Sequence, residues 1–245
     1  AKGVYESFGF SPIDTPVLEY TEILLGKGGA ETDKQLYRFT DNGGRDVALR
    51  FDLTIPFARF AAQHIGSLGT PFKRYHVGPV WRGENTQRGR YREFVQCDFD
   101  TIGTTSIVVD TESTLVIHDL FVALGFERFS VRLNNRKVLS GVLECLDLAD
   151  QAENVLRALD KLAKIGPEKV TAEMVSTAGC SEAQAAEVLA LAAITGDNAA
   201  ILTALEPLVG HSEQGQQGLA ELTAVLEGVQ AAGVAEGRVR LDLSI

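Results

Sequence analysis

The sequence predicts an α+β fold in which an antiparallel sheet domain is interrupted by an inserted helical domain. Two hairpin signals indicate the sheet, because short β-like runs flank DNGG at 41–44 and NTQRG at 85–89. From Lys137 to about Gly233 the chain is rich in Ala, Leu and Glu at helical spacing, which indicates a block of helices. The final RVRLDLSI returns to a strand pattern, so a strand precedes and follows this block. That arrangement favours an insertion over a separate terminal domain.

Local signals predict the elements of the first half in turn. A helix over 4–8 turns at Gly9, and Pro16 suits a strand edge. LYRFT and VALRFDLT are the strands on either side of DNGG, and IPFARFAAQHI is typical of a helix with Pro56 in its first turn. FKRYHVGPVWRGE and RYREFVQCDFDTI are the strands of the second hairpin.

The helical part begins with a helix from about Ser106 that stops at Gly125, followed by the strand FSVRLN. Within the helical block, Gly and Pro residues predict breaks at Gly166-Pro167, Gly179, Gly196-Asp197 and Pro207. We therefore expect a sheet domain over 1–136, a helical domain over 137–236, and a strand over 237–245 that returns to the sheet.

The charge distribution indicates one local anion site. The 245 residues carry a formal net charge of −10, which argues against a protein that coats nucleic acid. Within 71–95, however, only Glu84 and Glu93 oppose a group of basic residues, namely Lys73, Arg74, Arg82, Arg88, Arg90 and Arg92. This concentration is typical of a nucleotide-phosphate site, although a solvated charged hairpin explains the charge alone equally well.

Other features narrow the class of protein. There is no run of about 18 apolar residues and no signal-peptide pattern, so we expect no contact with a membrane. Cys97, Cys145 and Cys180 form no CxxC pair, which gives no signal for a zinc site or a disulfide framework. These features favour a protein of the reducing cytoplasm.

Side chains alternate along a strand, so the second hairpin has two faces. With Glu84 opposite Arg90, the even-numbered residues share a polar face: Arg82, Glu84, Arg90, Arg92, Phe94, Gln96, Asp98 and Asp100. The odd-numbered set, which includes Val95 and Cys97, is apolar and predicts the core face. A solvent-exposed face is the simpler interpretation of the polar set. Arginine, however, is preferred over lysine for bidentate phosphate recognition, so a ligand-binding face is favoured.

The second hairpin also resembles motif 2 of class II aminoacyl-tRNA synthetases, in the form found in histidyl-tRNA synthetases: YHVGPVWRGENTQRGRYREFVQCDFDTIG. The segment ALRFDLTIPFAR resembles that family's amino-acid pocket, and FGFSPIDTPVLEY resembles its motif 1. LRALDKLAKIG with the following helices is similar to its insertion domain. The resemblance implies that 1–136 is part of a class II catalytic core, that 137–236 is its helical insertion domain, and that 237–245 leads back to the catalytic sheet.

The resemblance implies a two-step reaction, in which ATP activates L-histidine to histidyl-adenylate and the histidyl group then passes to tRNA(His). The first step needs in-line positioning and cations more than covalent help. By its place in motif 2, Arg82 would be the catalytic residue and would bind the α-phosphate together with the attacking carboxylate. Glu84 would lie near the adenine amino group, Arg90 would contact the γ-phosphate, and Phe94 would stack on adenine. Mg²⁺ is expected with the pyrophosphate, and no protein ligand is assigned to it.

The resemblance also implies a histidine pocket built from two segments. Asp52 and Thr54 would hold the α-ammonium, with Leu53 between them and Gln96 beside them. Asp100 matches an acidic position that faces the imidazole ring. An alternative for Thr54 is that it only caps the helix that starts at Ile55-Pro56.

Contacts with larger partners are implied in the same way. Gln87, Arg88 and Arg92 are candidates for the tRNA acceptor end, and Pro16 of motif 1 is expected at the interface of a homodimer.

The family's motif 3 and its anticodon-binding domain are not found before Ile245, and the usual segment ahead of Ala1 is missing. We therefore expect a catalytic fragment that does not aminoacylate alone. Two other functions stay open. One is the synthetase-like regulatory subunit of ATP phosphoribosyltransferase, which the intact GRYREF and the Arg82/Glu84 pattern argue against. The other is a structural fragment that only dimerises, through the Pro16 region.

Overall fold

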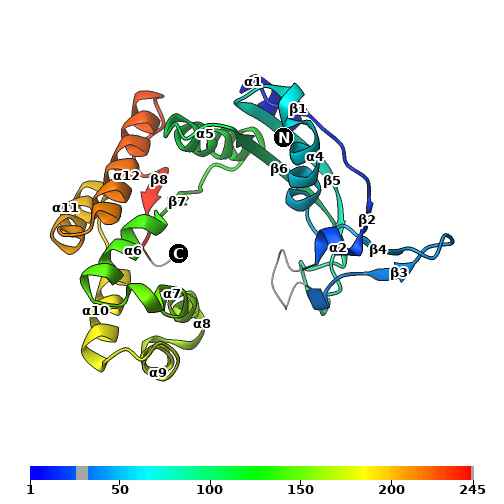
Figure 1. The fold of residues 1–245 in the computed structure, drawn as a ribbon. Coiled ribbons are helices and arrows are strands. Elements are labelled where there is room, and N and C mark those ends of the chain that lie inside the picture. The colour runs from blue at the N-terminus through cyan, green and yellow to red at the C-terminus, as the bar shows by residue number, and fades with distance from the viewer. Residues whose placement is uncertain (26–32, 244–245) are drawn as a thin grey trace. The chain divides into compact units, whose positions relative to one another are not determined.

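The computed structural model describes residues 1–25 and 33–243, and the chain divides into two compact units, 1–105 and 106–245 (Figure 1). Strands dominate the first unit and helices the second, so the predicted α+β class is confirmed. In the part of the chain that is described, no helix is long and apolar enough to cross a membrane. The first unit consists of α1 (Lys2–Ser7), β1 (Ser11–Pro12), β2 (Leu18–Tyr20), α2 (Thr21–Leu24), β3 (Arg38–Thr40), β4 (Asp46–Leu49), α4 (Thr54–Leu68), β5 (Phe72–Trp81) and β6 (Glu93–Ile102).

The main sheet of the first unit is the predicted second hairpin. Strands β5 and β6 pair antiparallel over their full length, and β1 lies parallel to β5 on the other side. The last ladder pair is Trp81 with Glu93, and the register continues only as far as the hydrogen bond from the Arg82 amide to the Arg92 carbonyl. Beyond it the backbone of Arg90 pairs with Gln87, so the predicted placement of Glu84 opposite Arg90 is wrong for the backbone, although Arg90 Nη1 lies 3.2 Å from Glu84 Oε2.

The prediction of which face of this hairpin is the core is wrong. The even-numbered side chains of β5 are buried, since Arg74 is 0% exposed and His76 3%. On the odd-numbered face, Val95 is 62% exposed and Cys97 is also exposed. The reason is that other parts of the unit cover the odd-numbered face only near Phe99. There the Phe99 ring packs against Tyr5 and Phe10, at ring-centroid distances of 5.4 Å. Alternation separates two faces but does not say which neighbours cover each.

The smaller sheet has the order β2-β4-β3 and is antiparallel throughout. Its predicted DNGG turn is confirmed: Asp41 Oδ1 accepts hydrogen bonds from the amides of Gly43 (2.9 Å) and Arg45 (3.0 Å), and Gly44 has a φ of +76°. A φ in this range is easy for glycine and strained for other residues. The helix α4 follows as predicted, with Pro56 in its first turn, where its missing N–H costs no helical hydrogen bond.

Helices make up most of the second unit, and most predicted breaks between them are confirmed. Gly179 ends a helix in the left-handed conformation, and Ser181 and Asp197 cap the next two helices with their side chains. Pro207 is different, because it lies inside its helix, which continues two residues further to Val209 although the proline cannot donate an i→i−4 hydrogen bond. The elements are α5 (Val108–Ala123), β7 (Val131–Leu133), α6 (Arg136–Cys145), η1 (Ala149–Gln151), α7 (Ala152–Leu159), α8 (Leu162–Ile165), α9 (Pro167–Ala178), α10 (Glu182–Ala192), α11 (Asn198–Val209), α12 (Glu213–Ala231) and β8 (Val239–Leu241).

The strands that precede and follow the helices of the second unit pair with each other. β7 and β8 are parallel, with Val131 opposite Val239, and residues 244 and 245 of the predicted final strand lie outside the described residues. Asn198 on α11 donates to the Val239 carbonyl and accepts from the Leu241 amide, both at 2.9 Å. The two compact units divide after residue 105, so α5 and β7 belong to the same unit as the later helices. The domain boundary at 136/137 stays a prediction.

Candidate functional site

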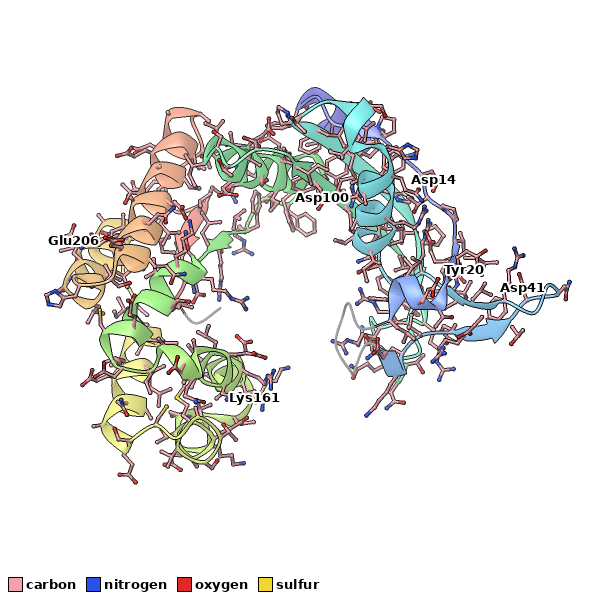
Figure 2. All side chains as sticks on the ribbon, in the orientation of Figure 1. Asp14, Tyr20, Asp41, Asp100, Lys161 and Glu206 are labelled. Atoms are coloured by element: carbon pink, nitrogen blue, oxygen red, sulfur yellow. The ribbon has the colours of Figure 1, made fainter. Side chains whose placement is uncertain are left out.

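The even-numbered face of β5 and β6 comes together with the segment that leads from β4 into α4. Arg82, directly after β5, donates from Nε to the carbonyl of Phe51 at 3.0 Å. Its guanidinium also lies 5.2 Å from the ring centroid of Phe94 on β6. Two stretches separated by about thirty positions therefore meet at Arg82. Asp100, labelled in Figure 2, lies on β6 of the same strand pair.

Glu84 and Arg90 form the rim of this site. Their ion pair is partly solvated, since the Arg90 side chain is 64% exposed and that of Glu84 21%. Arg92 Nε also donates to the Glu84 carbonyl, at 3.3 Å. A solvated ion pair contributes little stability, so an incoming anion could replace Glu84 as the partner of Arg90 at small cost.

The tip of the hairpin loop carries the three tRNA candidates into solvent. Gln87 and Arg90 close the turn through two backbone hydrogen bonds, of 3.3 and 2.8 Å. Gly89 has a φ of +81°, and Gln87, Arg88 and Arg92 are all exposed. The structure thus separates these candidates from the half-buried Arg82 and Phe94.

The three residues ahead of α4 have different environments. Asp52 is half-buried, and its Oδ1 accepts a hydrogen bond from the Ile55 amide at 3.1 Å. Thr54 is exposed and is the first residue of the helix, so the alternative in which Thr54 is the N-cap is wrong and Asp52 makes the capping contact. Leu53 is 0% exposed, so its side chain is part of the core and a ligand would meet it only through the backbone.

Three carboxylates and an amide lie at the buried end of the site. Burial raises the pKa of Asp52, Asp98 and Asp100 above the ordinary value, and the nearby charge of Arg74 counteracts this for each of them. Gln96 Oε1 is buried and accepts no hydrogen bond from the described residues. Such a set can accept hydrogen bonds from a polar, cationic ligand.

Sequence reasoning did not assign a role to Arg74, His76 or Asp98, which the structure places in the same cluster. Arg74 pairs with Asp100 and lies 4.2 Å from the centroid of the Phe57 ring. His76 is the ladder partner of Asp98. The signal that could have found the two β5 residues is parity, because both are even-numbered and continue the polar face of the hairpin along β5.

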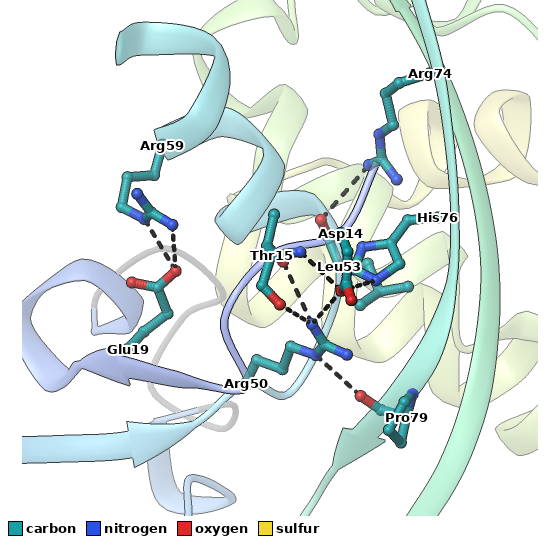
Figure 3. Close-up of polar contacts among 9 residues, drawn as sticks. All are labelled: Asp14, Thr15, Glu19, Arg50, Leu53, Arg59, Arg74, His76 and Pro79. Carbon is teal, nitrogen blue, oxygen red and sulfur yellow. Dashed lines mark hydrogen bonds and ion pairs between the residues drawn. The ribbon is translucent and has the colours of Figure 1, made fainter. Parts of the chain in front are cut away.

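A second buried polar network joins the Pro16 segment to β5 (Figure 3). Arg50 is 2% exposed and donates to the carbonyls of Thr15 at 2.6 Å and Pro79 at 3.0 Å. Asp14 Oδ1 lies 3.0 Å from His76 Nε2, and the pKa of His76 is lowered first by burial and then by the charge of Arg50. Arg50 thus fixes the segment before Pro16, and Pro16 itself is exposed.

Within residues 1–25 and 33–243, no group of three or more His, Cys, Asp or Glu side chains could hold a metal ion. Mg²⁺ differs, since it usually binds one or two carboxylates together with the phosphates of its substrate.

Comparison with known proteins gives a consistent match. The family model described as histidyl-tRNA synthetase matches residues 1–245. A protein named histidine–tRNA ligase from Rhodopirellula baltica is 58% identical over 245 residues, which are 100% of this chain and 55% of that protein. One of the same name from Wolinella succinogenes is 48% identical over 224 residues, 91% of this chain and 51% of that protein. The chain spans about half the length of the curated relatives it matches.

Solved structures agree. The crystal structure of histidyl-tRNA synthetase from Nostoc sp. PCC 7120 matches with a TM-score of 0.86 at 34% identity, covering 100% of this chain and 56% of that chain. A structure described as an ATP phosphoribosyltransferase regulatory subunit/histidyl-tRNA synthetase from Bacillus halodurans matches with a TM-score of 0.83 at 24% identity, covering 100% and 62%. The second likeness shows the fold alone. The fold is thus that of a class II synthetase catalytic domain.

Proposed function

The chain belongs to the histidyl-tRNA synthetase family, and we propose that it carries the adenylate-forming site of a histidine–tRNA ligase. One observation supports this most strongly. Arg82 connects the hairpin face that carries Phe94 to the segment beside Asp52, next to a cluster of half-buried carboxylates. An anion-binding guanidinium, an aromatic platform and acceptors for a cation are the groups that ATP and an amino acid require together.

In the proposed first step, the carboxylate of histidine attacks the α-phosphate of ATP, and pyrophosphate leaves. Arg82 holds both anions, which keeps them in line and neutralises the charge that grows on the phosphate oxygens. Phe94, beside it, stacks on adenine, and Glu84 accepts from the adenine amino group. Arg90 exchanges its weak pair with Glu84 for the γ-phosphate. Mg²⁺ arrives with the phosphates and supplies additional charge neutralisation when bound.

The histidine substrate lies at the carboxylate end of the same face. Asp52 and Thr54 hold the α-ammonium together with Gln96, whose buried Oε1 has room for a donor. Leu53 lines this wall through its backbone, since its side chain belongs to the core. Asp100 accepts from the imidazole ring. A buried polar pocket discriminates against amino acids that lack matching hydrogen-bond groups.

The second step transfers the histidyl group to tRNA(His). The exposed loop residues Gln87, Arg88 and Arg92 lie beyond the rim of the site, where they can contact the acceptor end. A reaction of translation takes place in the cytoplasm, and we assign the protein to that compartment.

The protein is proposed to act as a homodimer through the region of Pro16. The smaller sheet supports this, because it exposes large apolar residues in aligned positions: Tyr20 (48%) and Phe39 (44%) both pair with Val47, and Leu18 (47%) lies two residues along. An exposed apolar patch of this kind is typical of a protein interface. Sedimentation of the chain with Leu18→Asp against the unsubstituted chain tests it, since loss of a dimer is expected.

Histidine-dependent exchange of pyrophosphate with ATP tests the proposed function. It is measured on the 245-residue chain and on the product of the complete reading frame. We expect exchange with L-histidine and none with other amino acids, and we expect the 245-residue chain alone to be inactive. The second candidate, a regulatory subunit of ATP phosphoribosyltransferase, is supported only by the shared fold. Histidine binding by the complete product without any exchange would favour that candidate instead.

A further inference from the structure

We propose that Arg74 is a positioning residue that holds the Asp100 carboxylate, in its charged form, for recognition of the neutral imidazole ring of histidine. The inference rests on the proposed function, because Asp100 acts on the imidazole only if the site binds histidine. It adds a residue near the start of β5, directly before the stretch that resembles motif 2.

Three neighbours hold the guanidinium of Arg74. Arg74 is opposite Asp100 in the β5–β6 ladder, and the two side chains form an ion pair. Its Nη2 also points to the carbonyl of Leu53 at 3.5 Å (Figure 3), and the ring of Phe57 covers it at 4.2 Å. Arg74 therefore connects the two segments of the proposed histidine pocket, which are the residues ahead of α4 and the end of β6.

Burial separates this arginine from the others of the site. Arg74 is 0% exposed, whereas the Arg90 side chain is 64% exposed. A guanidinium does not lose its proton in a protein, so its burial has to be compensated by a carboxylate. Its Nε and Nη1 have no hydrogen-bond partner among the described residues, so the compensation is incomplete. Apolar residues of similar volume often stabilise a fold as well as a buried ion pair does, and stability alone is therefore a weak reason for Arg74.

The effect of Arg74 on Asp100 is electrostatic as well as geometric. Burial raises the pKa of the Asp100 carboxyl, and Arg74 is the group that lowers it. The charged or titratable side chains that act on this carboxylate cluster are Arg74, Arg82, Asp52 and Asp98, and His76 is the ladder partner of Asp98. Without Arg74, Asp100 lies beside other carboxylates, so it takes up a proton at higher pH. A protonated carboxyl loses acceptor capacity, which weakens its bond to an imidazole N–H.

Kinetics of histidine-dependent pyrophosphate exchange test the proposal on the product of the complete reading frame. We expect Arg74→Gln to raise the KM for histidine about tenfold or more, as for other lost polar contacts in specificity pockets, and to leave the KM for ATP within about twofold. The acid limb of the pH profile of kcat/KM for histidine should move to higher pH. Arg74→Lys keeps the charge and should restore part of the loss.

Asp100→Asn supplies the coupling test, because the substitution keeps the shape and removes the charge. Combining it with Arg74→Gln should add little further loss in the KM for histidine, since both variants remove the same interaction. Arg38→Gln removes an equal charge from an exposed pair with Asp46, at 2.9 Å, and serves as the control. Thermal unfolding of each variant separates a loss of fold from a loss of recognition.

The outcomes are distinct. Equal losses for histidine and ATP, additive effects of Arg74→Gln and Asp100→Asn, or an unmoved acid limb would overturn the role of Arg74 and leave the proposed function standing. If Arg74→Gln does not fold, the pH profiles of kcat/KM for histidine of Arg74→Lys and Asp100→Asn still test the role of Arg74, through the position of their acid limb. Absence of histidine-dependent exchange in the unsubstituted protein would overturn the proposed function, and this inference with it.

Discussion

The two units of the chain differ most in what they bury. Among the described residues, the first unit buries two arginines, a glutamate and a histidine, together with two threonines: Arg50, Arg74, Glu19, His76, Thr15 and Thr21. The buried polar residues described in the second unit are Thr114 and Ser212, which carry only hydroxyl groups. Ser212 is the N-cap of α12, and Thr114 bonds back to the Asp110 carbonyl within its own helix.

This difference indicates that the first unit is built around a polar site and the second around apolar packing. Buried charge contributes little net stability, so its presence in the first unit indicates selection for a polar site. The second unit has apolar clusters around residues such as Met174 and Leu205, which is what a packing module requires. Trp81 is the chain's single tryptophan and lies in the first unit, so its fluorescence reports on that unit, while far-UV circular dichroism follows mostly the helices of the second.

The largest effect should come from Arg50→Ala in the first unit. The substitution leaves the buried carbonyls of Thr15 and Pro79 without their donor and opens a cavity. We expect the free energy of unfolding of this unit to fall by about 3–5 kcal/mol. Urea unfolding followed by Trp81 fluorescence measures it. A shift of the circular-dichroism transition by the same amount would contradict the separation of the two units.

Arg82→Ala should affect activity instead of stability. Arg82 is only half-buried, and its side chain donates to the Phe51 carbonyl. We expect histidine-dependent pyrophosphate exchange by the product of the complete reading frame to fall by about 100-fold or more, as for other lost transition-state donors. The Trp81 transition should move by less than that of Arg50→Ala. Exchange at the unsubstituted rate would exclude Arg82 from the chemistry.

Gly141→Ala is the matching test for the second unit. A Cβ at this position would lie 2.4 Å from the Cα of Gly215, where α6 and α12 approach closely. We expect a loss of about 1–3 kcal/mol from overpacking, seen in the circular-dichroism transition and not in Trp81 fluorescence. Gly66→Ala in α4 of the first unit is the uncrowded comparison: nothing lies within 4 Å of the added carbon and alanine favours a helix by about 1 kcal/mol over glycine, so the Trp81 transition should not fall.

A smaller effect is expected from pH. Because burial raises the pKa of Asp52, Asp98 and Asp100, the folded first unit binds protons at a pH where the unfolded chain has lost them. Their contribution to stability therefore falls as pH rises from the ordinary carboxyl pKa through the raised values. The pKa of His76 is lowered, so its contribution to stability rises as pH rises from the lowered pKa to the ordinary histidine pKa.

Asp98→Asn isolates the carboxylate part of this pH dependence. The variant should gain stability at neutral pH relative to the parent and lose part of that gain on acidification, measured by urea unfolding with Trp81 fluorescence at each pH. An equal difference between variant and parent at every pH would show that the charge of Asp98 does not matter.

The smallest effect tests the face that sequence reasoning assigned to the core. Cys97 and Cys145 are exposed, and Cys180 is buried at 3% exposure. In the native 245-residue chain, iodoacetamide should label the first two thiols rapidly and Cys180 only after denaturation. Mass spectrometry of the peptides measures this. Protection of Cys97 would restore the original interpretation of the odd-numbered face.

Much of the local structure followed from the sequence. The turn at 41–44, the start of α4 with Pro56 and the breaks at Gly179 and Gly196-Asp197 depend on neighbours within a few residues. The break expected at Pro207 came two residues later, because α11 continues through the proline and ends at Val209. The site roles that motif 2 implies, from Arg82 to Asp100, remain predictions that the exchange experiments address.

By itself, then, the sequence determined the elements, their order, the two faces of the β5–β6 hairpin and the family. Only the tertiary structure decided which face is covered and that Arg74 pairs with Asp100 inside the sheet. The physical reason is the separation along the sequence of the residues that interact. Periodicity and turn chemistry act between residues close in sequence, whereas burial and ion pairing depend on segments brought together from distant positions, which no local pattern records.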